Sequence, residues 1–259
     1  MLLCNAQLVQ ENFTCVDTQI KRVPLDIVKK VEYYIHCYLS VREQSKLARQ
    51  RSEQTRYNML WARIMIKQIF SSQSGIPTSA YRDVEILNSV DDNVYGLPIL
   101  TYKGMQQDKY LAISHYDHEV GVSCSSAPCG IDIVKVFDQM PEQSFLDYSF
   151  TENEHSQLNK ITKMSDYLAM ITLLWGIKEA ISKYLGCGLR YGPGTIGIRY
   201  EGQKNFIHFL IHPKVHLVQK WLLDNISVKY FWNTGKTYCY VYVCQLQASE
   251  ERGGADESL

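Results

Sequence analysis

Two long helical stretches, each followed by short strand-like segments, constrain the fold of this chain more than any other feature. Helical periodicity covers Ser40–Phe70 and returns over Ser165–Leu185. Shorter helical stretches lie at Pro24–Leu39 and Phe150–Leu158. Strand-like runs bounded by turn residues lie within residues 1–20 and at Arg82–Leu87, Leu97–Tyr102, Tyr110–Ser114, Glu119–Cys124, Gly130–Val134, Ile196–Tyr200, Phe206–Ile211 and Tyr238–Gln245. The sequence therefore predicts a mixed α and β fold in which a similar order of elements is used twice, although no sequence repeat accompanies it.

Length and charge set broad limits on partners. The chain has 259 residues, enough to bury a core in one large domain or in two small ones. Its 27 Lys and Arg residues balance 27 Asp and Glu residues, so net charge gives no general attraction to nucleic acid or to an acidic membrane. We expect neither partner, and any anion site must be built locally.

The cysteines and the apolar segments indicate the compartment. The closest of the eight cysteines, Cys124 with Cys129 and Cys239 with Cys244, lack the CxxC spacing of zinc or redox sites, which indicates free thiols. The N-terminus has no basic leader, and the longest apolar run, around Tyr167–Trp175, is too short to span a bilayer. These observations predict a protein of the reducing cytoplasm.

Two patterns imitate known sites without their structural context. The run GPGTIG at Gly192–Gly197 spells the dinucleotide fingerprint, but a helix precedes it and strand-like residues follow, so we interpret its glycines as loop residues. His208, His212 and His216 have the spacing of helical metal ligands, yet the β-like run around them and Pro213 argue against a helix.

The segment GIDIV places Asp132 between Ile131 and Ile133, in a strand-like run whose neighbours favour burial. A carboxylate in such surroundings has to be paired, hydrogen-bonded or bound to a metal. Taken alone, an aspartate that caps a turn is the commoner explanation.

The segment WGIKEAISK places Trp175, Glu179 and Lys183 on nearly one face of a helix, because they follow each other at intervals of one turn. A solvated Glu to Lys pair, worth about 0.3–0.5 kcal/mol, is one interpretation. An acid and a cation arranged around a substrate is the other, and the apolar neighbours of this face favour a closely packed helix. Lys178 lies about 100° away around the helix, where a solvated flank is expected.

The combination and order of four segments resemble the 4′-phosphopantetheinyl transferase superfamily, in its larger, monomeric class. The resemblance covers roughly Lys46–Leu189 and includes two upstream segments. The segments are ISH (Ile113–His115), GIDIV (Gly130–Val134), FTENEHSQL (Phe150–Leu158) and WGIKEAISKYLGCGL (Trp175–Leu189), with WARIMIKQIF and YGLPIL upstream.

This resemblance implies an α+β fold made of a pseudo-twofold pair of similar subdomains, with coenzyme A bound between them. We expect an N-terminal subdomain at residues 1–128 and a C-terminal subdomain with the metal and the catalytic helix at 129–247. The polar residues 248–259 are expected to be a disordered tail.

The resemblance also implies roles for individual residues. Asp132 and Glu179 match the metal ligands, for Mg²⁺ or alternatively Mn²⁺, and Lys183 matches the lysine of the catalytic helix. Ser114 and His115 match a pair that contacts a phosphate of coenzyme A. Lys46 lies near the position of a cation for the 3′-phosphate, though this part of the match is loose.

Two departures from the family pattern affect these roles. Many relatives have a second acid where this chain has Val134, so we expect water to replace one metal ligand, which Mg²⁺ tolerates. The family's GKP loop reads GLP at Gly96–Pro98, which removes a lysine at Leu97. The remaining candidates for phosphate binding are Gly96 itself, Lys46, Arg63, Lys67 and His115.

The implied reaction moves phosphopantetheine from coenzyme A to a serine of an apo acyl or peptidyl carrier protein. The serine hydroxyl needs a base within hydrogen-bond reach, for which Glu179 is the first candidate and Glu154 the second. Lys183 would stabilise or protonate the departing phosphate. Carrier proteins of this family are acidic, so Lys160 and Lys163 are candidate contacts, although ordinary exposed lysines explain them equally well.

Two other functions remain open. A coenzyme A-binding relative without transferase activity is suggested by Val134 and Leu97. An unrelated Mg²⁺-dependent phosphohydrolase would use the same two carboxylates and would release phosphopantetheine to water.

Overall fold

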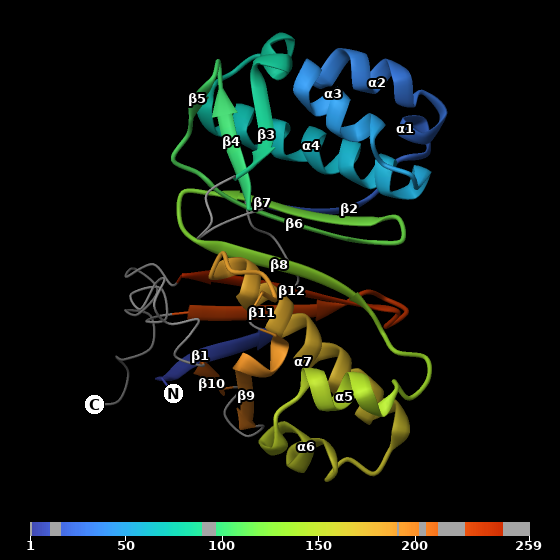
Figure 1. Ribbon diagram of the computed structural model, residues 1–259, viewed down its shortest axis with the longest axis vertical. Coiled ribbons are helices and arrows are strands. Elements are labelled where there is room, and N and C mark those ends of the chain that lie inside the picture. The colour runs from blue at the N-terminus through green and yellow to red at the C-terminus, as the bar shows by residue number, and fades with distance from the viewer. Residues whose placement is uncertain are drawn as a thin grey trace, which may run out of the picture.

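The computed structural model describes residues 2–10, 17–89, 97–190, 192–201, 206–211 and 226–245. Two halves, each with helices and strands, are stacked along the longest axis of the molecule (Figure 1). This confirms the predicted α+β class. Gly96 and the tail at 248–259 lie outside the described residues, so the expectations for them stay predictions.

The first half contains α-helices and two small sheets, and its longest helix, α4, packs on β7. Its helices are α1 (Leu25–Lys29), α2 (Val31–Tyr38), α3 (Val41–Ala48), α4 (Glu53–Ser74) and the 3-10 helix η1 (Thr78–Asp83). One sheet has the order β2-β7-β6, with β2 (Thr18–Arg22), β6 (Tyr110–Tyr116) and β7 (Glu119–Ser125). The other has the order β3-β4-β5, with β3 (Val84–Asn88), β4 (Pro98–Tyr102) and β5 (Met105–Gln106).

The second half packs its long helix α7 on one face of a six-stranded sheet, against β8 and β12. The helices are α5 (Gln143–Ser149), α6 (Glu152–Leu158), α7 (Met164–Tyr184) and the 3-10 helix η2 (Pro193–Thr195). The sheet has the order β8-β12-β11-β1-β10-β9. Its strands are β8 (Cys129–Lys135), β12 (Tyr238–Gln245), β11 (Ile226–Trp232), β1 (Leu2–Gln10), β10 (Phe206–Ile211) and β9 (Ile196–Glu201).

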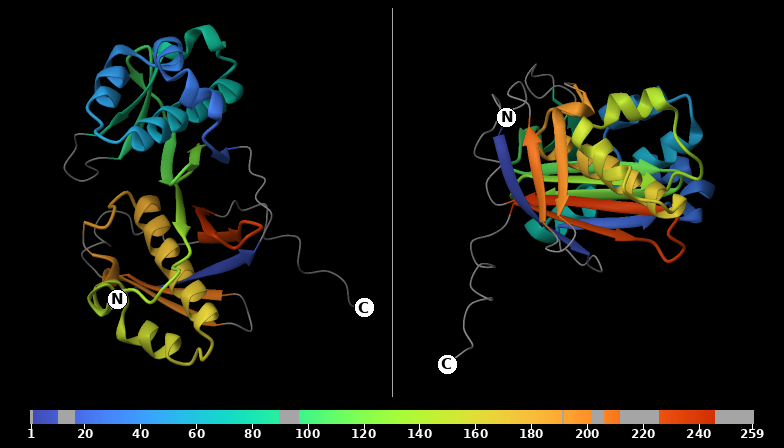
Figure 2. Two further views of the ribbon diagram at one scale, coloured as in Figure 1. Left: turned by 90° about the vertical axis from the view of Figure 1, so that its right-hand side faces the viewer. Right: turned by 90° about the horizontal axis from the view of Figure 1, so that it is seen from below.

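The position of β1 departs from the expected division of the chain. The strand pairs in parallel with β11 and antiparallel with β10, so residues 2–10 belong to the sheet of the second half. Figure 2 shows this blue strand beside the red strand of β11. The expected N-terminal subdomain at 1–128 is therefore not contiguous in space, whereas the boundary at 128/129 coincides with the start of β8.

The helical stretch expected over Ser40–Phe70 is broken into α3 and α4. Ser40 begins α3 with a capping box, in which its side chain accepts a hydrogen bond from the Glu43 amide and the Glu43 carboxylate accepts one from the Ser40 amide. Ser52 starts α4 by accepting from the Thr55 amide. Capping residues, which the periodicity alone does not register, decide where the first helix ends and the second begins.

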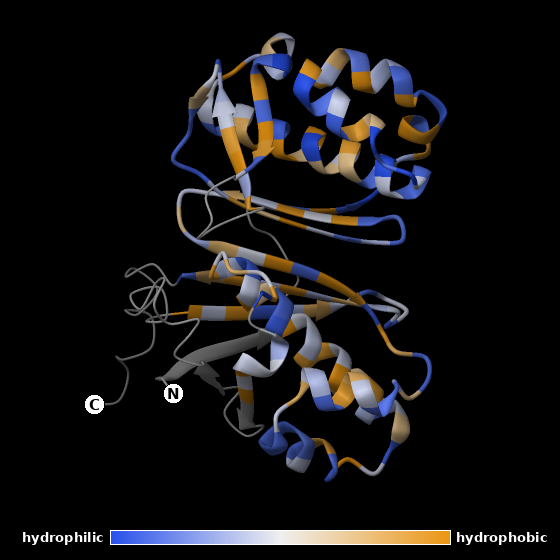
Figure 3. Ribbon diagram, in the orientation of Figure 1, coloured by the Kyte–Doolittle hydropathy of each residue, from blue (hydrophilic) through white to orange (hydrophobic). Residues whose placement is uncertain are grey.

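Each half has its own hydrophobic core, built around α4 in the first half and around α7 in the second. A small third cluster, which includes Ala112, Ile131 and Tyr242, lies where β6, β8 and β12 meet. Figure 3 shows hydrophobic residues along β8, the strand that faces the first half. This third cluster packs β6 of the first half against β8 and β12 of the second, and we call this contact between the halves the seam.

Gly130 lets β8 approach α7 at backbone distance. A Cβ atom at this position would lie 1.9 Å from the Ala180 carbonyl oxygen and 2.8 Å from the Tyr184 amide nitrogen. Only glycine fits there. The close contact therefore explains why the first residue of GIDIV is a glycine. It also brings Asp132, two residues further along β8, close to α7.

Four further sequence interpretations can be compared with the described part of the chain. GPGTIG forms η2 and the start of β9, so no helix follows its glycines within the described residues. Among the described residues, none of the cysteines Cys37, Cys124, Cys129, Cys187, Cys239 and Cys244 forms a disulfide. His208 lies on β10, whereas His212 and His216 fall outside the described residues. In the described part of the chain, no helix has the length and apolarity needed to cross a membrane.

Candidate active site

A buried aspartate joins β6 to β8 at the seam between the halves. Asp132 on β8 is 6% exposed. The Ser114 hydroxyl on β6 donates to its Oδ1 at 2.8 Å and accepts from the Ile133 amide at 3.2 Å. The Ser114 hydroxyl therefore links β6 to β8 through two hydrogen bonds, and it orients the Asp132 carboxylate.

Lys183 of α7 neutralises this aspartate. Its Nζ donates to Oδ1 of Asp132 at 2.7 Å and to the carbonyl oxygen of Ile131 at 3.0 Å. The lysine side chain is 26% exposed and the aspartate side chain 8%. A buried charge of this kind is tolerated because it is paired and hydrogen-bonded. The sequence predicted that Asp132 needs a partner, but it did not identify Lys183 as that partner.

Glu179 lies one turn before Lys183 on the same helix face and lines the same cavity. Burial raises the pKa of its carboxyl group, the negative charge of Asp132 raises it further, and Lys183 opposes both. Two carboxylates that repel each other at an open cavity suit a divalent cation.

The donor set fits Mg²⁺ with only two protein carboxylates. Among the described residues, no group of three or more His, Cys, Asp or Glu side chains is placed to hold a metal ion. Val134 also lines the cavity, where the family resemblance predicted a further acid in many relatives. Mg²⁺ keeps several waters and often uses one or two carboxylates, so Asp132 and Glu179 suffice as its protein ligands.

The cavity around these groups has a volume of about 320 Å³ and is open to solvent. Trp175 forms one wall and is held by Phe145, whose ring centroid lies 5.1 Å away. The other lining residues are Ile113, Ser114, His115, Tyr116, Asp132, Ile133, Val134, Glu179 and Lys183. We call this space the carboxylate cavity.

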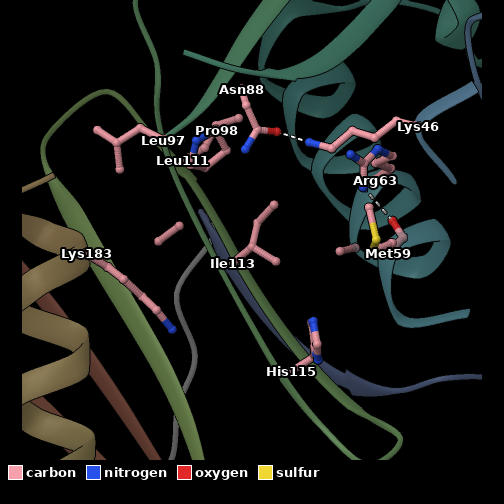
Figure 4. A pocket seen from close by; sticks show the side chains of 12 residues that line it. Lys46, Met59, Arg63, Asn88, Leu97, Pro98, Leu111, Ile113, His115 and Lys183 are labelled. Carbon is pink, nitrogen blue, oxygen red and sulfur yellow. Dashed lines mark hydrogen bonds between the residues drawn. The ribbon is translucent and has the colours of Figure 1, made fainter. Parts of the chain in front are cut away.

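A second cavity, of about 310 Å³, adjoins the first, and three cationic side chains and His115 lie among its mostly apolar lining residues. Lys46 and Arg63 extend from α3 and α4, His115 comes from β6, and Lys183 reaches it from α7 in the other half (Figure 4). The two cavities share Ile113, His115 and Lys183, so they are neighbours, and together we call them the cleft. We call the second cavity the cation cavity.

Burial and neighbouring positive charges disfavour the charged forms of the basic side chains in this cavity. Burial lowers the pKa of Lys46, and the positive charge of Arg63 lowers it further. Burial also lowers the pKa of His115, as does Lys183, while Asp132 opposes them. Lys46 donates a hydrogen bond to Oδ1 of Asn88, an amide that does not neutralise it. An anion such as a phosphate would relieve this repulsion.

Glu154, the second candidate for the base, does not face the cleft, so this assignment is wrong. The residue is 1% exposed, and its carboxylate is 2.8 Å from Nζ of Lys178. It also accepts from the Thr151 amide at 2.7 Å and from the Ile198 amide at 2.9 Å. With its oxygens occupied and water excluded, Glu154 cannot take a proton from a substrate serine.

Lys67, a candidate for phosphate binding, is likewise removed from the cleft. It is 0% exposed, and its Nζ donates to Oε2 of Glu43 at 2.6 Å and to two backbone carbonyl oxygens. Lys178, expected on a solvated flank, is also 0% exposed. Both lysines stabilise the interior. Lys160 and Lys163 are exposed, as a partner surface requires.

Glu43, Asn88 and Tyr116 were not among the predicted site residues. Asn88 lines the cation cavity and Tyr116 the carboxylate cavity, and neither lies in a motif that marks it. A signal for Glu43 exists in the sequence, because Ser40 and Glu43 have the spacing of a capping box, as do Thr151 and Glu154. The same pattern occurs once in each half.

The chain is similar to known proteins in the region that contains these residues. Residues 128–232 match the family model of the 4′-phosphopantetheinyl transferase superfamily, and this range contains Asp132, Glu179 and Lys183. A 4′-phosphopantetheinyl transferase gsp from Aneurinibacillus migulanus is 24% identical over 174 residues. That match spans 65% of this chain and 65% of the relative's length.

Two solved structures of holo-[acyl-carrier-protein] synthases are also similar to parts of the chain. The enzyme from Neisseria meningitidis is 20% identical, with a TM-score of 0.36, over 46% of this chain and 98% of that one. The enzyme from Thermotoga maritima is 19% identical, with a TM-score of 0.30, over 52% of this chain and 73% of that one.

Proposed function

We propose that this chain transfers phosphopantetheine from coenzyme A to a serine of an apo acyl or peptidyl carrier protein, because residues 128–232 match the family model of the 4′-phosphopantetheinyl transferase superfamily. The observation that carries the proposal is the pair of neighbouring cavities, one with two carboxylates and the other with Lys46, Arg63 and Lys183 in its wall. Coenzyme A has a 3′-phosphate that is separate from its pyrophosphate, so it needs cations for the first and a metal site for the second.

Coenzyme A would lie along the cleft with its 3′-phosphate in the cation cavity. Lys46 and Arg63 would neutralise this phosphate, and His115 and Lys183 would hold the pyrophosphate where the two cavities join. The pantetheine arm would leave through the carboxylate cavity, past Trp175.

Asp132 and Glu179 would hold Mg²⁺. The bound ion would neutralise charge on the pyrophosphate oxygens, which is the main requirement of phosphoryl transfer. Ser114 keeps the Asp132 carboxylate in place, and the buried backbone around Gly130 keeps β8 against α7. These contacts give the site the rigidity that positioning needs.

The proton of the attacking serine would pass to Glu179. Glu179 is the candidate for this base because its side chain lines the carboxylate cavity. A bond forms between the serine Oγ and the β-phosphorus, and the bond from that phosphorus to the bridging oxygen breaks. Adenosine 3′,5′-bisphosphate departs, and Lys183, already oriented by Asp132, would stabilise its new terminal phosphate.

A coenzyme A-binding protein without transfer activity is the second candidate. Val134 in the carboxylate cavity and Leu97 in the cation cavity favour it, because both replace charged groups of active relatives. The cytoplasmic location and the monomeric state expected from the sequence accompany the first proposal as predictions.

Intact mass spectrometry of an apo carrier protein tests the proposal. The carrier is incubated with the chain, coenzyme A and Mg²⁺, and we expect a mass gain of one phosphopantetheine, roughly 340 Da. Glu179→Ala should abolish the gain, whereas Glu53→Ala, which removes an exposed acid of α4, should preserve it. Binding of coenzyme A without a mass gain on several classes of carrier would favour the second candidate instead.

A further inference from the structure

Each half of the molecule contains the same buried arrangement of one glutamate and one lysine. In both, a capping-box glutamate accepts from a lysine 24 residues further along, on the long helix of its half. We call Glu43 with Lys67 the first buried pair and Glu154 with Lys178 the second. Each lysine also donates to a backbone carbonyl 29 residues earlier, on Tyr38 and Ser149 respectively.

The match extends to both oxygens of each carboxylate. Oε2 of Glu43 accepts from the Ser40 amide at 3.0 Å, and Oε2 of Glu154 accepts from the Thr151 amide at 2.7 Å. Oε1 of each glutamate accepts from a strand amide, Ile86 at 3.0 Å in the first half and Ile198 at 2.9 Å in the second. The two pairs therefore perform one structural task, which is to join a helix start, a long helix and a strand.

One difference separates the two pairs. Arg63 lies one turn before Lys67, and its Nε is 3.6 Å from Oε1 of Glu43. The corresponding position, one turn before Lys178, is Leu174, which is buried in the core of the second half. The first buried pair therefore has a cationic neighbour that the second buried pair lacks, and that neighbour lines the cation cavity.

Arg63 is incompletely satisfied where it lies. It is 4% exposed, and its Nη1 donates to the Met59 carbonyl oxygen at 3.1 Å. Its buried Nε has no hydrogen-bond partner, and Nη2 forms no hydrogen bond within the described residues. Lys46 adds a second positive charge nearby. A buried guanidinium with unused donors at the wall of a cavity indicates an anionic ligand.

We propose that Glu43 is a positioning residue, which orients Arg63 toward the 3′-phosphate of coenzyme A in addition to its structural bond with Lys67. This inference rests on the proposed function. Glu43 attracts the Nε edge of the guanidinium, and the Met59 carbonyl fixes Nη1, so the Nη2 edge is presented to the cavity. Glu154 has the same structural task and no such role, because Leu174 replaces the arginine.

Coenzyme A and 3′-dephospho-coenzyme A, which differ only in this phosphate, provide the test. Calorimetry gives the dissociation constant of each ligand, and the carrier reaction gives its KM and kcat. Both are measured for the wild type, Glu43→Gln, Arg63→Leu, the double variant and Glu154→Gln. Arg63→Leu is expected to fold because the second half accommodates leucine at the matching position. Glu43→Asp is measured as well, since it keeps a charge for Lys67 while withdrawing from Arg63.

We expect the wild type to bind coenzyme A more tightly than the dephospho form. Glu43→Gln and Arg63→Leu should each reduce this preference by about 10-fold, mainly through KM, and the double variant should resemble Arg63→Leu because the two residues act in series. Glu43→Asp should give an intermediate loss. Glu154→Gln should lower stability and leave the preference unchanged.

Several results would overturn the inference. The first is an unchanged preference in Glu43→Gln or, where that variant does not fold, in Glu43→Asp. The second is an equal loss of preference in Glu154→Gln. The third is a wild type that does not distinguish the two ligands. None of them bears on transfer itself, which the wild-type mass gain reports separately. A wild type without mass gain whose binding preference still depends on Glu43 would refute the transferase and leave the inference standing.

Discussion

The close approach of β8 to α7 at Gly130 predicts that a single methyl group would disable the site. In Gly130→Ala the new Cβ would lie 1.9 Å from the Ala180 carbonyl oxygen and 2.8 Å from the Tyr184 amide nitrogen. Both are backbone atoms, so no side chain can rotate away, and the strand and helix must separate by about 1 Å or more. Overpacking costs typically 1–3 kcal/mol, and this rigid contact places the expected loss at about 3 kcal/mol or above.

The same separation would stretch the Asp132 to Lys183 ion pair, which is 2.7 Å long. Activity should therefore fall even at temperatures where Gly130→Ala remains folded. Gly176→Ala is the matched control, because its Cβ would meet the side-chain methyl groups of Val241 at 3.0 Å and Val134 at 3.1 Å. Those groups can shift by a few tenths of an ångström, so we expect a loss of about 1 kcal/mol or less.

Urea unfolding gives the stability of both variants, and the carrier assay gives their activity. A Gly130→Ala protein as stable and active as the wild type would refute the close-contact reasoning. So would a Gly176→Ala protein that loses as much as Gly130→Ala, because the distinction between backbone and side-chain contacts would then have no consequence.

Two further changes test the interior and the cleft. Lys178→Met should lower the free energy of unfolding by about 3–5 kcal/mol in urea titrations, because it leaves the Glu154 carboxylate buried without its cation. Lys163→Met, which changes an exposed lysine, should alter the free energy of unfolding little. Equal effects of the two variants would contradict a buried structural pair. Since the pKa of His115 is lowered below its usual 6.5 in the folded protein, the unfolded chain binds this proton more readily, and stability should decrease as the pH falls below about 6.5. His115→Asn should remove that part of the pH dependence of thermal unfolding, and an unchanged profile would show that burial of His115 has no such effect.

Part of the arrangement around Asp132 could be predicted from the spacing of residues along the sequence. Glu179 and Lys183 share one helix face at a one-turn interval, and an aspartate between two isoleucines needed a partner, which is Lys183. Local periodicity and the cost of burying charge are properties of short segments. They are readable without knowing the tertiary fold.

The errors arose where burial depends on the whole fold. Glu154, Lys67 and Lys178 are charged residues with the pattern of exposed helix positions, but each is buried because its partner lies 24 residues away on another helix. The two capping boxes were visible in the sequence, whereas the lysines that complete them were not identifiable from spacing alone.

Long-range strand pairing was equally hidden. β1 joins the sheet of the second half through pairing with β10 and β11, and no short segment encodes that choice. The strand β11 at Ile226–Trp232 was missed, because Lys229 interrupts its apolar run. Neighbouring strands within the sheet supply the pairing that its local sequence does not predict.

The stoichiometry of the products shows whether this cleft moves phosphopantetheine to a carrier protein. A single reaction with apo carrier, coenzyme A and Mg²⁺ is analysed for the carrier mass and for both small-molecule products. We expect modified carrier and adenosine 3′,5′-bisphosphate in equal amounts, with no free phosphopantetheine. Release of free phosphopantetheine without modified carrier would show a phosphohydrolase and refute the proposed transfer.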